Sequence, residues 1–120
     1  TLVVDCDLTE SGSKDALETL MANKRKPSAI VTFNDYVSAY AIKHARKLGL
    51  ITTNELEFVS YANTPMINFM ENGPVASIEQ FPSVQAQKAV DVLFDLFNTS
   101  ENESQAYYKI TVDAELVENN

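Results

Sequence analysis

The chain has 120 residues, of which 45% are hydrophobic and 22% charged, and this composition suits one ordinary globular domain. Its net charge of −8 argues against direct binding of a nucleic-acid backbone by this segment, because such binding needs clustered Lys and Arg. No apolar stretch approaches the ~20 residues of a membrane helix. The sequence shows no signal-peptide pattern, and we expect a cytoplasmic protein that does not bind membranes. Thr1 is not an initiator Met, so we also expect a fragment of a longer protein.

In the first half of the chain, apolar runs and amphipathic segments predict alternating strands and helices. Residues 2–6 are an apolar run typical of a strand. Apolar residues at helical spacing then predict a helix over residues 11–23. A second strand is expected over residues 28–33, followed by a second helix over residues 36–48 that ends at Gly49.

The second half of the chain continues the alternation. Residues 57–61 predict a strand, and Pro65 can begin a short helix, because proline suits the first helical turn. A strand over residues 75–78 and an amphipathic helix over residues 82–98 follow, and residues 107–112 alternate like a last strand. This order is typical of a layered α/β fold with a mainly parallel sheet.

Polar residues follow three of the predicted strands. Asp7 follows the first, Asn34 and Asp35 the second, and Asn63 the third. Because the carboxyl ends of parallel strands share one edge of a sheet, we expect these side chains to line one cleft. Amides and carboxylates suit a small, neutral ligand rich in hydroxyls. Each residue also has a local alternative: Asn34 or Asp35 can cap the next helix, and Asp7 and Asn63 can form turns.

The sequence does not favour catalysis or metal binding. His44 is the only histidine and lies among Lys43, Arg46 and Lys47, on a helix face that we expect to be solvated. No second His or Cys lies near enough to suggest a metal site, and we expect Cys6 to act as a small buried hydrophobe. Neither a phosphate-binding Gly-rich loop nor a Gly-x-Ser-x-Gly elbow is present. We therefore predict a protein that is not an enzyme and needs no metal or cofactor.

Several motifs together resemble one known family. In chain order they are PSAIVTFND (residues 27–35), LEFVSY (residues 56–61), PVASIEQ (residues 74–80) and ELV (residues 115–117). Each motif is loose by itself, but their order and spacing resemble the effector-binding domain of the LacI/GalR transcription regulators. The resemblance covers nearly the whole chain.

The resemblance implies a fold and a set of partners. Such regulators are similar to periplasmic sugar-binding proteins, in which two α/β lobes close on a small ligand. Residues 1–120 would form the carboxyl-terminal lobe, a three-layer sandwich with a mainly parallel sheet, and helix 82–98 would pack on an amino-terminal lobe outside this chain. The implied partners are a sugar-like effector, a second copy of the protein, and operator DNA bound only by an absent helix-turn-helix module.

The resemblance also implies roles for particular residues. Asn34 matches a cleft asparagine that contacts effector, Asp7 matches a loop position that packs on it, and Gln80 lies at a crossover between the lobes. Ala62 stands where many members carry an aspartate that contacts sugar, and Ser60 replaces a glycine. The implied dimer interface consists of Tyr36, Ala39, Tyr40, Lys43, Met66 and Met70.

Two interpretations from the sequence stay open. Core burial is an equal alternative to the dimer interface for Tyr40 and Met66. A periplasmic sugar-binding receptor of a transport system is the alternative to a transcription regulator, whereas a small α/β enzyme would need a reactive side chain that the sequence does not offer. In the absence of the other lobe, we expect helix 82–98 to expose an apolar face, and the fragment to dimerise or to swap this helix with a second copy. That face consists of Val84, Val92, Leu93, Leu96 and Phe97.

Overall fold

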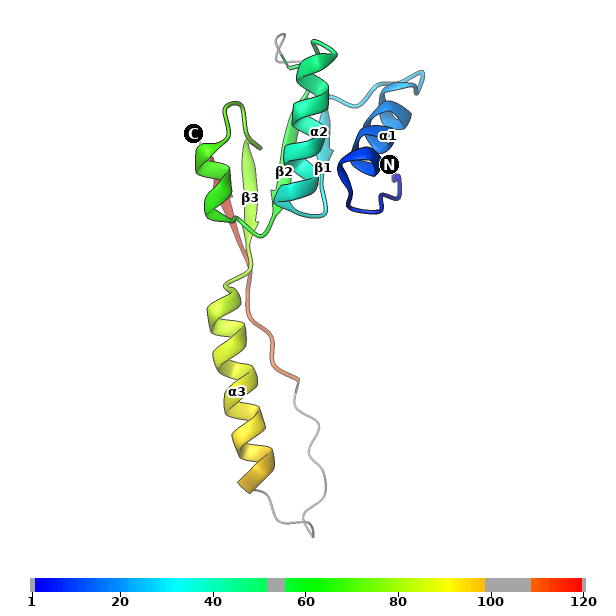
Figure 1. The fold of residues 1–120 in the computed structure, drawn as a ribbon. Helices are drawn as coiled ribbons and strands as arrows, with labels where there is room; N and C mark the ends of the chain where they lie inside the picture. The colour runs from blue at the N-terminus through cyan, green and yellow to red at the C-terminus, as the bar shows by residue number, and fades with distance from the viewer. Residues whose placement is uncertain (1, 52–55, 99–108, 120) are drawn as a thin grey trace. The chain divides into compact units, whose positions relative to one another are not determined.

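A computed structural model describes residues 2–51, 56–98 and 109–119 (Figure 1). The chain divides into two compact units. The first contains Thr1–Glu79 and Leu116–Asn120, and the second contains Gln80–Glu115. Each unit is described by itself.

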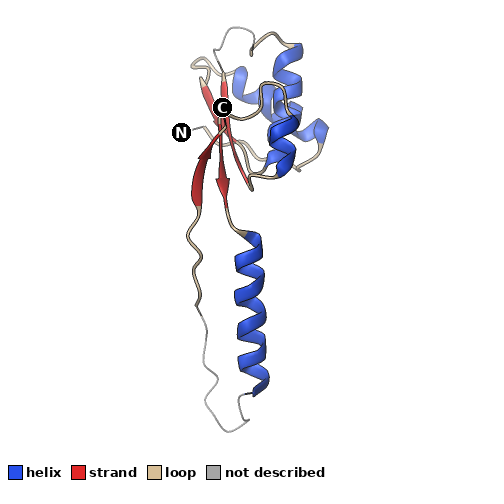
Figure 2. Ribbon diagram, turned by 90° about the vertical axis from the view of Figure 1, so that its left-hand side faces the viewer, coloured by secondary structure: helices blue, strands red, loops and turns tan. Residues whose placement is uncertain are grey.

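The first unit is an α/β structure built on a four-stranded sheet. The strands lie in the order β1-β2-β3-β4, and the β1–β2 and β2–β3 pairs are parallel. The helices lie on one face of this sheet (Figure 2), and the α/β class with a mainly parallel sheet is confirmed. The elements are α1 (Glu10–Met21), β1 (Ala29–Val31), α2 (Asp35–Lys47), β2 (Glu57–Tyr61), the 3₁₀ helix η1 (Pro65–Phe69), β3 (Ala76–Glu79) and β4 (Glu115–Glu118).

Local sequence explains where α2 begins and ends. The side chain of Asn34 accepts a hydrogen bond from the backbone N–H of Val37 at 2.9 Å, which satisfies one of the unpaired donors of the first turn. Basic residues in the last turn interact favourably with the negative end of the helix dipole. The chain then leaves the helix at Gly49, whose φ of 74° is a left-handed conformation that glycine adopts without strain. The predicted helix end at Gly49 is confirmed.

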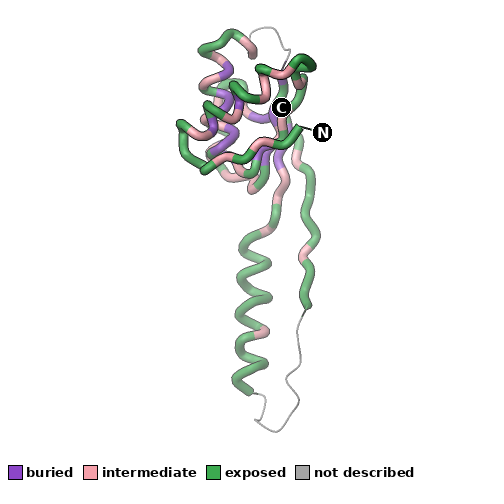
Figure 3. The backbone as a smooth tube through the Cα atoms, turned by 90° about the vertical axis from the view of Figure 1, so that its right-hand side faces the viewer, coloured by how far each residue is buried: buried purple, intermediate pink, exposed green. Residues whose placement is uncertain are grey.

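The core lies between the helices and the sheet, where Figure 3 shows most of the buried residues. Residues alternate along β2, so Phe58 and Ser60 are buried on the helical side of the sheet. On the other face Val31 is 68% exposed and Tyr61 is 40% exposed. Within the described part of this unit, the sheet therefore has one covering layer of helices. The core cluster consists of Leu17, Ala41, Ile42, Ala45, Leu56 and Phe58.

Two predicted strands differ from the structure. Residues 2–6 are not a strand, because no described strand lies hydrogen-bonded beside them and β1 is the end of the sheet. Residues 109–112 are also not a strand, while residues 107–108 lie outside the described residues. An apolar or alternating pattern favours extended backbone, but a strand also needs a partner, which the pattern cannot supply.

The second unit consists mainly of α3 (Pro82–Asn98), which has the bounds predicted from the sequence. None of its residues is buried (Figure 3). Val84, Leu93, Leu96 and Phe97 of the predicted apolar face are exposed, and Val92 is half-buried. The packing of α3 on an amino-terminal lobe stays a prediction. Among the described residues, no helix has the length and apolar character needed to span a membrane.

Candidate ligand-binding edge of the sheet

The loops that carry the predicted site residues of the first unit lie at one end of it. Figure 1 shows the segments leading into α1, α2 and η1 at the lower end of this unit. Asp7 precedes α1, Asn34 and Asp35 follow β1, and Asn63 follows β2. We call this end the carboxyl edge, because β1 and β2 finish there.

Asn34 is half-buried and serves as the N-cap of α2. Its Oδ1 accepts the Val37 N–H, so the capping alternative for this residue is confirmed. Among the described residues, its Nδ2 donates to no protein acceptor. One side-chain amide therefore caps the helix through its oxygen and keeps two N–H donors for another partner.

Asp35 is completely buried, and protein donors surround its carboxylate. Oδ1 accepts a hydrogen bond from the Ser60 hydroxyl at 2.5 Å and lies 3.2 Å from the Ser77 hydroxyl. Oδ2 accepts the backbone N–H of Thr64 at 2.7 Å. Contact between Asp35 and a ligand stays a prediction, but in this arrangement both of its oxygens are occupied by the protein.

The loop after β2 has an unusual backbone conformation. Ala62 has φ 96° and Asn63 has φ 47°, and both values lie in the left-handed region. Such residues cost of order 1–3 kcal/mol each in strain, with Asn the better tolerated of the two, so the surroundings must hold them there. The loop is therefore fixed by its contacts rather than by its own preferences.

Three successive backbone N–H groups supply those contacts. Ala62 donates to the carbonyl of Ile78 at 3.0 Å, and Asn63 donates to the Ser77 hydroxyl at 3.0 Å. Thr64 donates to Asp35. The Asn63 side chain adds a hydrogen bond from Nδ2 to Glu79 at 3.2 Å. The loop is thus attached to β3 and to the start of α2 at the same time.

Asp7 is exposed and stabilises the turn before α1. Its Oδ1 accepts the hydroxyl of Thr9 at 2.6 Å and the backbone N–H of Thr9 at 2.9 Å. These two hydrogen bonds hold the pKa of the Asp7 carboxyl below its usual value of 3.8. Gly12 leaves room for this carboxylate, since a Cβ at Gly12 would stand 1.9 Å from Oδ1. The turn-forming alternative is confirmed, and contact with an effector stays a prediction.

Gln80 is the first residue of the second unit and is exposed. Its carbonyl accepts a hydrogen bond from the side chain of Gln85 at 2.6 Å. The structure thus links Asp35, the sequence neighbour of Asn34, with the loop that contains Asn63. The role of Gln80 at a crossover between lobes stays a prediction.

Sequence reasoning missed the serines that complete this edge. Ser60 and Ser77 are paired in the register of β2 and β3, so their side chains meet on the same face of the sheet. Both are completely buried, and a buried hydroxyl requires a partner. A serine inside each of two apolar strands therefore indicates a buried polar partner, although the sequence could not show that both serines contact Asp35.

The predicted dimer surface has mixed exposure. Tyr36 is exposed, while Tyr40 and Met66 are half-buried. Half-burial does not decide between core packing and a dimer interface for Tyr40 and Met66. Lys43 forms an ion pair with Glu10 at 2.6 Å, which raises the pKa of Lys43 and lowers that of Glu10. Met70 packs against the core, and Ala39 is half-buried. The dimer interface stays a prediction.

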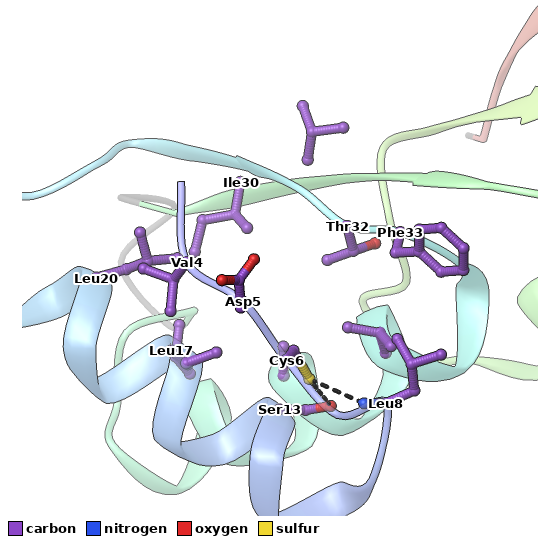
Figure 4. Close-up of a pocket in the computed structure, with 14 residues that line it drawn as sticks. Val4, Asp5, Cys6, Leu8, Ser13, Leu17, Leu20, Ile30, Thr32 and Phe33 are labelled. Carbon is purple, nitrogen blue, oxygen red and sulfur yellow. Dashed lines mark hydrogen bonds between the residues drawn. The ribbon is translucent and has the colours of Figure 1, made fainter. Parts of the chain in front are cut away.

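A cavity lies between the amino-terminal segment and β1, with a volume of about 380 Å³ (Figure 4). Its lining is mostly apolar and includes Leu17, Leu20 and Ile30. Cys6 also lines it and is half-buried; its sulfur accepts the Leu8 N–H at 3.3 Å. Apolar walls suit hydroxyl-rich molecules poorly, so we place the candidate site at the carboxyl edge. No cluster of His, Cys, Asp and Glu suited to a metal ion occurs in the described ranges.

An α/β unit with polar groups gathered at the carboxyl ends of its parallel strands has the architecture of a ligand-binding lobe. Comparison with known families agrees with this class. Residues 3–118 match the model of the periplasmic binding protein-like domain, and the chain belongs to that family. A search of curated proteins finds no match.

Solved structures share the fold. A LacI-type transcription regulator from Bifidobacterium animalis is 23% identical with a TM-score of 0.77, covering 92% of this chain and 38% of its own. The transcriptional regulator CelR, in complex with cellobiose, is 16% identical with a TM-score of 0.79, and the match covers 93% of this chain and 33% of CelR. A periplasmic solute-binding protein of an ABC transporter from Actinobacillus succinogenes, with bound D-allose, is 19% identical with a TM-score of 0.70. The match covers 94% of this chain and 39% of that protein. The chain thus spans two fifths or less of the length of these three chains.

Proposed function

We propose that this chain is the carboxyl-terminal lobe of the effector-sensing region of a cytoplasmic LacI-type transcription regulator. A small sugar-like molecule would bind at the carboxyl edge and need a second lobe to enclose it. Because the effector would bind the closed arrangement more tightly, it would shift the population of a homodimer between forms that differ in operator affinity. No step in this function requires catalysis by the chain.

The arrangement of polar groups at the carboxyl edge carries the proposal. Asn34 caps α2 with its oxygen and keeps its N–H donors, while the neighbouring loop of Ala62 and Asn63 is held in a strained conformation by three backbone hydrogen bonds. Strained and over-determined backbone is characteristic of preorganised sites. The fold supports the same proposal, since solved relatives with this fold include regulators and a sugar-bound receptor.

The proposal is tested with the protein expressed from its natural gene. Titration calorimetry with D-allose and cellobiose measures sugar binding, and a gel shift with DNA from upstream of the gene measures operator binding with and without sugar. We expect at least one sugar to bind and to change the DNA affinity. Sugar binding without any DNA binding would instead favour the transport receptor, the function of the D-allose-bound relative. Absence of both activities would refute the proposal.

A matched pair of variants locates the site. Asn63→Ala removes the side chain at the candidate edge, and Asn68→Ala changes an exposed asparagine of η1. We expect Asn63→Ala to weaken sugar binding about 10-fold or more, the loss of one to two hydrogen bonds, while Asn68→Ala leaves it unchanged. Equal effects of the two variants would place the sugar elsewhere.

A further inference from the structure

Asp35 is the one charged side chain that is completely buried among the described residues. A carboxylate loses much hydration free energy when it is buried, and it persists only if donors or cations replace water. No ion pair involving Asp35 occurs in the described part of the chain. Its compensation therefore comes from hydrogen bonds and from its place in the first turn of α2, where the helix dipole favours an anion.

Those hydrogen bonds come from separate segments. Ser60 belongs to β2, Ser77 to β3 and Thr64 to the loop before η1, while Asp35 itself is the first residue of α2. Each serine hydroxyl has one proton. The shorter distance assigns the Ser60 proton to Asp35, and Ser77 can donate either to Asp35 or to Ser60, whose oxygen lies 3.0 Å away.

The serine pair also connects Asp35 to the backbone of Asn63. The Ser77 oxygen accepts the Asn63 N–H, and Asp35 accepts the next N–H along the chain, that of Thr64. Two consecutive amides of the loop are thus held by one buried cluster, which consists of Asp35, Ser60 and Ser77. These are the amides that follow Ala62, whose φ of 96° is unfavourable without such support.

We propose that Asp35 is a positioning residue that holds residues 62–64 in the conformation that faces the ligand. The inference rests on the proposed role of the carboxyl edge in ligand binding. Asp35 acts through the loop, and its own oxygens remain with protein donors. An asparagine cannot replace it fully, because a carboxylate offers two accepting oxygens and an amide offers only one.

The experiment is amide hydrogen exchange by NMR on the 120-residue chain and three variants. Asp35→Asn replaces the charged acceptor of Thr64, and Ser77→Ala removes the acceptor of Asn63 while it leaves Asp35 in place. Asp15→Asn is the control, because it makes the same charge change at an exposed position of α1. Amides of Leu17 and Ile42, both in the core, report global opening.

The two substitutions should speed hydrogen exchange at different amides of the loop. Asp35→Asn should speed exchange at Thr64 by about 10-fold or more, and Ser77→Ala should do the same mainly at Asn63. The core amides and the Asp15→Asn control should change far less. Unchanged exchange at Thr64 in Asp35→Asn, or an equal increase at the core amides, would overturn the proposal. If Asp35→Asn does not fold, Ser60→Ala takes its place, with a several-fold increase expected at Thr64 and no change refuting the proposal.

Sugar titration separates this inference from the proposed function. In the full protein, with D-allose and cellobiose as probes, Asp35→Asn should weaken binding about 10-fold relative to Asp15→Asn. If the unaltered protein binds neither sugar, the proposed function fails, while the exchange experiment still decides whether Asp35 positions the loop. If sugar binds equally to both variants, the proposed function survives, and the claim that Asp35 positions the loop for ligand binding is refuted.

Discussion

The helix-capping role of Asn34 and its proposed contact with the ligand can be separated by substitution. Asn34→Ala removes the acceptor of the Val37 N–H. Val37 is only 7% exposed, so water replaces that acceptor poorly. We expect the free energy of unfolding to fall by about 1–2 kcal/mol, the upper part of the range for loss of an N-cap. Serine is as good a cap as asparagine, so Asn34→Ser should stay within about 0.5 kcal/mol of the unaltered chain.

Urea unfolding followed by far-ultraviolet circular dichroism measures these stabilities, and sugar titration of the full protein measures affinity. Asn34→Ser should keep stability and lose affinity, because serine caps the helix but lacks the amide donors. Asn34→Ala should lose both. The reasoning would be refuted if Asn34→Ser bound sugar normally, since the free amide donors would then have no role in binding. Equal destabilisation by Ala and Ser would contradict the capping argument.

Three further predictions concern the turn before α1, the core and α3. The pKa of Asp7 is lowered in the folded chain, so its contribution to stability is present above the unfolded pKa and is lost as pH falls through the folded pKa. Asp7→Asn should therefore make the free energy of unfolding fall less steeply at acidic pH. An unchanged pH dependence in this variant would contradict the prediction. Phe58→Ala leaves a cavity in the core cluster and should cost about 3–5 kcal/mol by urea unfolding, whereas a loss below ~1 kcal/mol would show that Phe58 is not closely packed. The 120-residue chain should dimerise through α3, and Leu93→Glu should restore a monomeric mass in light scattering; a monomeric unaltered chain would refute this.

Periodicity was enough to predict most elements of this fold. The helix over Pro82–Asn98 and the strand over Glu57–Tyr61 have the predicted bounds, and α1 and α2 differ by one or two residues at their ends. These segments carry their own signals: a repeating apolar face, capping residues and a terminal glycine. Residues 2–6 carried an equally clear apolar pattern but are not a strand, because strand formation depends on a neighbour that lies elsewhere in the chain.

The candidate site could be predicted only in part for the same reason. The pair Asn34 and Asp35 marked the end of a strand, and helix capping could explain either residue. Asn34 is the cap, and Asp35 instead forms hydrogen bonds with Ser60 and Ser77, which lie 25 and 42 residues away in sequence. Local pattern contains no information about contacts over such separations. The sequence therefore indicated where the polar edge lies, and the structure distinguished the half-buried donor, Asn34, from the buried acceptor, Asp35.

The position of β1 at the end of the sheet has a practical consequence for handling this chain. No described strand covers the outer edge of β1, and Val31 at its end and Phe33 just after it are largely exposed. An uncovered edge with apolar neighbours is a template on which other extended chains can add and build intermolecular sheet. Preparations of the isolated 120 residues should therefore become turbid as concentration and temperature rise. A lysine at Val31 would put a charge at this edge, which is how many natural sheets prevent aggregation.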